Sequence, residues 1–122
     1  MKRAVRYCTT DDGVRIAFRV DGDGPPLVVV PPFPASFSTM HLVPSWKKFI
    51  TALGRGRTLV HYDVRGTGLS QRDVNDVSME AIIRDADSVV TAAGLAGFDA
   101  FVGGLATPFA IAYCARPASR VN

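Results

Sequence analysis

The chain has 122 residues, 48% of them hydrophobic and 20% charged, and its formal net charge is +3. This length and balance are ordinary for one globular domain and exclude a disordered chain. The apolar runs are far shorter than a bilayer span and none follows the first basic residues, so we expect no membrane segment and no secretory leader. The cationic residues are scattered along the chain, which argues against a nucleic-acid partner.

The first third of the sequence predicts three strands. The pattern indicates strands over Val5 to Thr9 and Val14 to Val20, joined by a turn whose Asp12-Gly13 pair is typical of a hairpin. After a turn-rich link, Leu27 to Val30 has the continuous apolar character of a buried strand in a parallel sheet. Pro31 to Pro34 ends this strand and begins a long loop.

The middle of the sequence predicts a helix and then another strand. Ser45 is the expected N-cap of the helix, and apolar residues recur at the spacing of one helical face from Trp46 to Leu53. Gly54 fits the end of this helix. The short run from Thr58 to Tyr62 predicts the next strand.

Two further helices flank the last predicted strand. Ser78 is expected to cap the first of these helices, and Gly94 is expected to end it. The strand follows over Asp99 to Val102, and Pro108 fits the first turn of the final helix. An opening hairpin followed by alternating strands and helices predicts an α/β fold with a mostly parallel sheet.

No further parallel strand is predicted after the one at Asp99 to Val102. That strand would then be an apolar sheet edge with unpaired backbone groups. We therefore expect self-association, or pairing with a partner chain, at this strand.

The sequence indicates neither a metal ion nor a cofactor. The two cysteines, Cys8 and Cys114, lie far apart and lack metal-ligand spacing, so reduced thiols in a cytoplasmic protein are the simplest interpretation. The turn at Gly66-Thr67-Gly68 lacks the third glycine of a dinucleotide fingerprint and the lysine of a phosphate loop. Asp63 and Arg65 are expected to brace this turn as an ion pair.

The segment around Gly104 has the setting of a nucleophile elbow without its nucleophile. From Phe98 to Tyr113 an apolar strand, a tight turn and an apolar helix succeed one another, as in the G-x-S-x-G elbow that exposes a serine hydroxyl. Counted without gaps, the serine position falls on Gly104, and a shift of one residue places Leu105 there. Neither residue has a group that can attack a carbonyl carbon.

Several short motifs follow one another in a fixed order over nearly the whole chain. They are Arg6-Tyr-Cys-Thr9, Asp12-Gly-Val-Arg-Ile-Ala17, Gly24-Pro-Pro-Leu-Val28, Leu59 to Ser70, Asp73 to Asp76, Ala92 to Leu95, Ala110 to Tyr113 and Arg120-Val121. In this order they resemble the N-terminal part of the α/β-hydrolase fold. They are most similar to the branch found fused ahead of adenylyl cyclase domains or helix-turn-helix regulators.

The resemblance implies a truncated α/β-hydrolase core, with residues 1–122 forming one incomplete domain. In that family the elbow reads much like G-x-S-x-G-G-P. Here a degenerate elbow stands in its place, formed by Gly103, Gly104, Leu105, Ala106 and Thr107. The acid and the histidine of a catalytic triad come later in that family than the residues present here. We therefore expect no catalytic residue in this sequence.

Main-chain amides can outlast the loss of a catalytic side chain. By position, the amides of Phe33 and Leu105 correspond to the oxyanion hole of the resembled family. A small carbonyl or carboxylate ligand would dock between them.

The other polar candidates each have a simpler structural interpretation. Thr107 is expected to cap the last helix, and Cys114 to be a packed thiol on its body. His61 fits a packing role within its strand, and His41 fits a solvent-facing loop.

The sequence thus predicts a catalytically inactive α/β-hydrolase-like domain that binds a small ligand or a protein, or is the remnant of a longer sensor. A second hypothesis is one half of a serine-type ester hydrolase that another chain completes. A DNA-binding regulator is a third, suggested only by the domains to which the resembled branch is fused.

Overall fold

Five strands form a single mixed sheet in the computed structural model, which describes residues 4–31, 36–40, 42–102, 106–115 and 121. The strands are β1 (Arg6–Thr9), β2 (Arg15–Gly22), β3 (Pro26–Val29), β4 (Thr58–Tyr62) and β5 (Asp99–Phe101). Their order in the sheet is β1-β2-β4-β3-β5. The β1–β2 and β2–β4 pairs are antiparallel, whereas β3 pairs in parallel with both β4 and β5.

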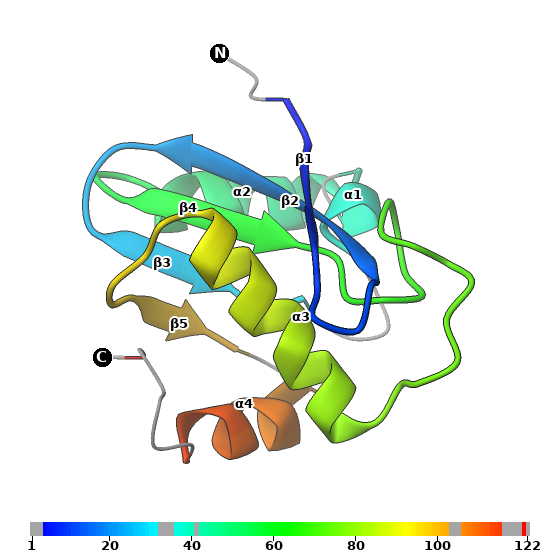
Figure 1. Ribbon diagram of the computed structural model, residues 1–122. Coiled ribbons are helices and arrows are strands. Elements are labelled where there is room, and N and C mark those ends of the chain that lie inside the picture. The colour runs from blue at the N-terminus through cyan, green and yellow to red at the C-terminus, as the bar shows by residue number, and fades with distance from the viewer. Residues whose placement is uncertain (1–3, 32–35, 41, 103–105, 116–120, 122) are drawn as a thin grey trace.

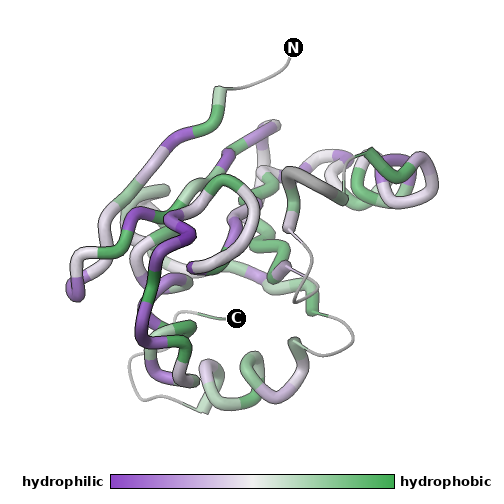
Figure 2. Tube along the Cα trace, turned by 90° about the vertical axis from the view of Figure 1, so that its right-hand side faces the viewer, coloured by the Kyte–Doolittle hydropathy of each residue, from purple (hydrophilic) through white to green (hydrophobic). Residues whose placement is uncertain are grey.

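Helices cover both faces of this sheet. They are α1 (Phe37–Met40), α2 (Pro44–Leu53), α3 (Met79–Ala92) and α4 (Thr107–Cys114). In Figure 1, α3 and α4 lie in front of the sheet, and α1 and α2 lie behind it. Figure 2 shows the same layers from the side. The predicted α/β class with an opening hairpin is confirmed, and the sheet, which was expected to be mostly parallel, is mixed and partly parallel.

Sheet pairing accounts for the main differences in strand length. The strand β2 was expected to end at Val20 but continues to Gly22, because Asp21 and Gly22 still pair with Leu59 and Thr58 of β4. The turn that follows requires glycine at position 24. Gly24 has a φ of +126°, and a Cβ atom there would clash with the Gly56 carbonyl oxygen.

The helix starts agree with the sequence at one position and differ at another. Ser78 caps α3 as predicted, since its side chain accepts the Ala81 N–H. The prediction for Ser45 is wrong. The N-cap of α2 is Val43, and Pro44 takes the first turn, where a proline loses no hydrogen bond. The short helix α1 was also not predicted, because the sequence there indicates only a loop.

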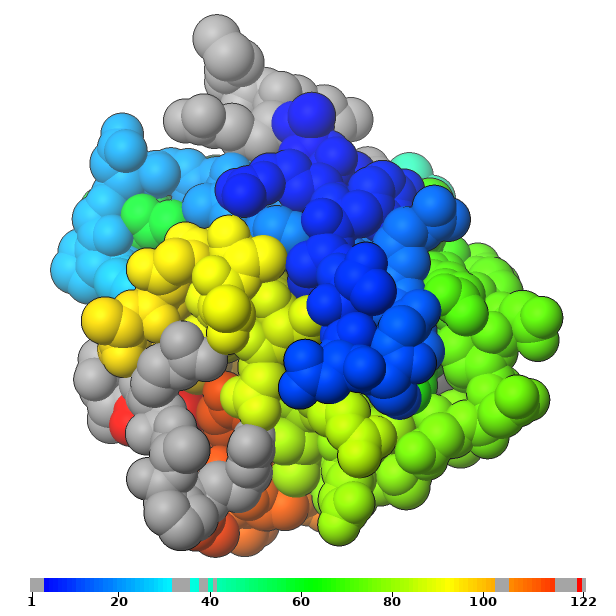
Figure 3. Space-filling model, in the orientation of Figure 1, coloured from blue at the N-terminus to red at the C-terminus, as the bar shows by residue number. Residues whose placement is uncertain are grey.

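Two apolar clusters hold the helices to the sheet. The larger lies under α3 and α4, where Phe18, Val60 and Val89 are almost completely buried. The smaller lies under α2 and is built on Leu27, Val29 and Leu59. The space-filling view in Figure 3 shows α3 and the β1–β2 hairpin side by side on the near face of the molecule.

The strand β5 lies at the end of the sheet, as the sequence predicts. It has one neighbouring strand, β3, among the described residues. An isolated parallel bridge joins Phe98 to Val121 just before β5 begins. Within the described part of the chain, no helix has the length and apolar character that crossing a bilayer requires.

Candidate functional site

The carboxyl ends of β3, β4 and β5 meet at the edge of the sheet where the degenerate elbow belongs. Of the elbow residues, Gly103, Gly104 and Leu105 lie outside the described residues, and so does Phe33, the other predicted oxyanion-hole residue. Ala106 is buried and is the N-cap of α4. These predictions about the elbow and its amides therefore stay predictions.

An apolar pocket of about 220 Å³ borders this edge. Its walls come from the segments that follow β3 and β4 and from the first turns of α3 and α4. They are Val30, Pro31, Val64, Val77, Met79, Ile82, Ala106, Pro108 and Phe109. None of these side chains carries a nucleophile, an acid or a base. The pocket can accept an apolar group beside the elbow, but its described walls supply no reactive atom.

The sequence predictions for three other polar residues, Thr107, Cys114 and His41, have different outcomes. Thr107 is the first residue of α4 rather than its cap, because the chain turns into the helix one residue earlier, at Ala106. Cys114 is exposed, so the prediction of a packed thiol is wrong. The reason is that Cys114 is the last residue of α4, whose buried residues are Phe109 and Tyr113. His41 lies outside the described residues.

His61 is a packed histidine on the face of the sheet that α1 and α2 cover. It is 7% exposed, and its ring lies against Phe37 with a centroid distance of 6.0 Å. Burial, aided by the neighbouring positive charge of Arg19, lowers the pKa of His61 to about 4. The imidazole is therefore neutral near pH 7. A pocket of about 310 Å³ under α2 includes His61, but its one described hydroxyl, on Thr51, donates to the Lys47 carbonyl.

A buried ion cluster braces the turn after β4. The Arg65 guanidinium donates to Asp85 through Nε at 3.0 Å and to Asp12 at 2.7 and 3.1 Å. The Arg65 main-chain N–H also donates to Asp85 at 2.8 Å. Arg65 holds the pKa of Asp12 well below its usual range, whereas burial raises the pKa of Asp85. The cluster joins the hairpin turn, this turn and α3.

The predicted ion pair between Asp63 and Arg65 is therefore wrong. Asp63 is fully buried and accepts the main-chain N–H groups of Phe37 at 2.8 Å and Leu69 at 3.0 Å. A carboxylate that follows a strand is well placed to collect loop amides, and it fixes the start of α1 against the turn. Through these contacts both charged residues, Asp63 and Arg65, hold the edge of the sheet in place.

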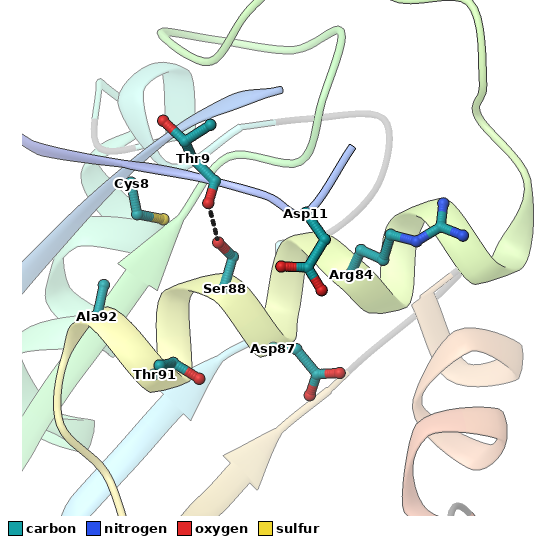
Figure 4. A pocket seen from close by; sticks show the side chains of 8 residues that line it. All are labelled: Cys8, Thr9, Asp11, Arg84, Asp87, Ser88, Thr91 and Ala92. Atoms are coloured by element: carbon teal, nitrogen blue, oxygen red, sulfur yellow. Dashed lines mark hydrogen bonds between the residues drawn. The ribbon is translucent and has the colours of Figure 1, made fainter. Parts of the chain in front are cut away.

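A polar pocket of about 300 Å³ lies between β1 and α3 (Figure 4). The Ser88 hydroxyl in it donates to the Thr9 carbonyl at 3.1 Å, so this hydroxyl braces the hairpin. Burial raises the pKa of the Cys8 thiol, which makes the thiol a poorer nucleophile. Asp87 accepts the Tyr113 hydroxyl at 2.9 Å. The described residues here do not form a nucleophile–base pair.

Comparison with solved structures shows which fold this is. A hydrolase from Pseudomonas aeruginosa PA01 is similar over 97% of this chain, with a TM-score of 0.82 and 19% identity. An esterase from Exiguobacterium antarcticum is similar over 94% (TM-score 0.77, 21% identity), and an epoxide hydrolase from Vigna radiata over 96% (TM-score 0.76, 19% identity). No protein-family model and no curated protein matches the chain.

The chain thus has the fold of part of an α/β-hydrolase core. It spans 43%, 41% and 37% of the lengths of these three structures. At this level of identity the likeness establishes the architecture and carries no activity with it.

Sequence reasoning missed the partners of Arg65. A signal was present, because Asp85 interrupts the apolar face of the predicted helix between Ile82 and Val89. A carboxylate at such a position needs a buried cation. Arg65 follows the preceding strand directly and supplies that cation.

Proposed function

We propose that this chain is a catalytically inactive α/β-hydrolase-like domain that acts by binding. The observation that carries the proposal is Gly104 at the serine position of the elbow. A glycine offers no oxygen for covalent catalysis, and this holds however long the natural protein is. The likeness to the branch fused to cyclases or regulators fits a sensor of this kind.

The described surroundings support the same reading. The histidine that the structure describes, His61, is buried under α2 and contacts Phe37 rather than the carboxyl edge of the sheet. The apolar pocket beside the elbow and the amides of Phe33 and Leu105 would then serve recognition. A small carbonyl or carboxylate compound is the ligand that such amides suit.

Ester hydrolysis tests this proposal. We expect the purified, folded protein to hydrolyse p-nitrophenyl acetate no faster than the same amount of unfolded protein in the same buffer. The variant Gly104→Ser restores the hydroxyl but no base, so we expect it to stay inactive as well. Turnover that follows the folded wild-type protein through purification would overturn the proposal. Turnover gained only in Gly104→Ser would show that a base and an oxyanion hole are already in place.

The outer side of β5, where the described residues contribute the Phe98–Val121 bridge and no further strand, favours a second candidate, in which another chain completes the sheet. The Val30 N–H donates to the Phe101 carbonyl at 3.0 Å, so the polar groups of Phe101 point toward β3. Those of Ala100, one residue away, then point outward, because backbone groups alternate along a strand. A strand from a second copy or from a partner could pair there and complete an ester hydrolase of serine type.

We expect the wild-type protein to self-associate through β5, measured by sedimentation at increasing concentration. Ala100→Pro removes an outward N–H and should give a monomer with unchanged circular dichroism. Ala100→Ser keeps this N–H and is the matched control. A wild-type protein that stays monomeric at high concentration, or an associating Ala100→Pro variant, argues against pairing at β5.

A further inference from the structure

An open groove lies between α2 and the strands β2 and β4, on the face of the sheet that α1 and α2 cover. It consists of two neighbouring hollows of about 310 and 410 Å³, which share the lining residues Arg19, Ile50, Thr51 and His61. We call it the α2 groove. None of its described lining residues lines the apolar pocket beside the elbow, so the groove is separate from that pocket.

His61 lies where the two hollows meet, and its capacity for hydrogen bonding is unused. The residue is 7% exposed, and among the described residues its ring nitrogens have no hydrogen-bond partner. Unlike the Tyr62 hydroxyl, these nitrogens are not sealed inside the protein, so the exposed part of the ring opens to the groove. A neutral imidazole carries one N–H donor and one acceptor nitrogen. Because buried polar groups are normally paired, His61 indicates a place for a ligand that accepts a hydrogen bond.

Positive charge predominates around His61. Arg19 lies directly opposite His61 in the β2–β4 pair, so both side chains project from the same face of the sheet. The charged side chains that line the groove are three cations and one anion, namely Arg19, Lys47, Arg55 and Asp21. Asp21 pairs with Arg19 at 2.8 Å. Lys47 and Arg55 have no ion-pair partner among the described residues, so the groove favours an anionic ligand.

Aromatic side chains line the same hollow as Lys47. The Phe37 ring lies against His61 with a centroid distance of 6.0 Å, and the half-buried Trp46 is a second aromatic wall. The volume of this hollow reaches the lower end of the range for small-molecule sites, roughly 300 to 1,000 Å³. Aromatic walls beside cations suit a ligand that combines a ring with one negative group.

We propose that the α2 groove binds a compact aromatic carboxylate, whose ring lies against Phe37 and Trp46 and whose oxygen accepts the His61 N–H. Burial keeps His61 neutral near pH 7, so it supplies a hydrogen bond while the neighbouring cations supply the charge. The inference goes beyond the proposed function, because the groove contains no described residue of the elbow or of its pocket.

Benzoate and benzamide are suitable probes, because they share a shape and only benzoate is charged. Trp46 is the only tryptophan of the chain, so its fluorescence reports on this groove. We expect benzoate to change this fluorescence saturably and to shift the His61 ring signals in NMR spectra. Benzoate should bind about three- to tenfold more tightly than benzamide, because the cations lie partly in solvent and each contributes modestly.

Lys47→Gln and Lys48→Gln form a matched pair. Both remove an exposed lysine charge from α2, but Lys48 lines neither hollow. We expect Lys47→Gln to weaken benzoate binding about two- to fivefold and to leave benzamide binding unchanged, whereas Lys48→Gln should change neither. His61→Phe keeps a ring and loses the N–H, so it should weaken the binding of both probes about three- to tenfold.

Four results would each overturn the inference. They are the absence of a saturable change in Trp46 fluorescence, equal affinity for the two probes, equal effects of the two lysine substitutions, and unchanged binding in His61→Phe. If His61→Phe does not fold, the two lysine variants decide the question, because both positions are exposed. Benzoate that shifts NMR signals elsewhere but not those of His61 binds at another place, such as the elbow, and also overturns the inference. Ester turnover is a separate readout, so failure here leaves the proposal of an inactive elbow untouched.

Discussion

Replacing Arg65 with methionine should lower the free energy of unfolding by about 3–5 kcal/mol, a large share of the stability of a small domain. Arg65 and Asp85 are 2% and 0% exposed, and the guanidinium is the ion-pair partner that faces the Asp85 carboxylate. Methionine fills the space but leaves a buried carboxylate without its cation, and this uncompensated charge is the main cost. Urea unfolding at neutral pH measures the change.

Arg84→Met is the matched control for this prediction. Arg84 also pairs with Asp12 and Asp76, but at 3.6 and 3.7 Å and with its side chain 40% exposed. Its loss should change the free energy of unfolding by no more than about 0.5 kcal/mol. Equal effects of the two substitutions would show that the buried cluster does not brace the fold.

Acid should destabilise the protein strongly through His61. The pKa of this histidine falls from about 6.5 in an unfolded chain to about 4 in the folded protein. Between these values the unfolded chain binds a proton that the folded protein does not, so stability falls as the pH falls. Above about pH 6.5 His61 does not lower the free energy of unfolding, and by pH 4 its protonation in the unfolded chain lowers this free energy by about 3 kcal/mol.

Urea unfolding between pH 7.5 and 4 measures this dependence. In His61→Gln, the slope of the free energy of unfolding against pH should become much shallower across this window, whatever the substitution does to the absolute value. His41→Gln is the control, since the sequence predicts an exposed position for His41. An unchanged slope in His61→Gln would mean that His61 is as accessible to protons in the folded protein as in the unfolded chain.

The order of strands and helices could be predicted because it depends on local patterns. The alternation in β2, the Asp12-Gly13 turn and the Ser78 cap each act over a few residues, and the structure confirms them. The ends of elements depend on neighbours instead. The extra length of β2 exists because β4 lies beside it, and this neighbour comes much later in the sequence.

The elbow and its amides stay predictions, because Gly103 to Leu105 and Phe33 lie outside the described residues, and the side-chain partners near them could not be predicted. A glycine at the elbow position is visible in the sequence. The pairing of Arg65 with Asp12 and Asp85 joins three segments far apart in the chain, so no spacing rule indicates it. Likewise, the Tyr62 hydroxyl lacks a partner among the described residues only once α3 and α4 cover the sheet.

The most direct test of the central proposal is the intact mass of the protein after incubation with a fluorophosphonate, which forms a covalent ester with an activated serine. A known serine esterase, treated in the same way, is the positive control. We expect the mass of this protein to stay unchanged while the esterase gains one adduct. A stoichiometric adduct on the folded protein, absent when the protein is unfolded before the incubation, would show an activated nucleophile and contradict the proposal of a domain that binds without reacting.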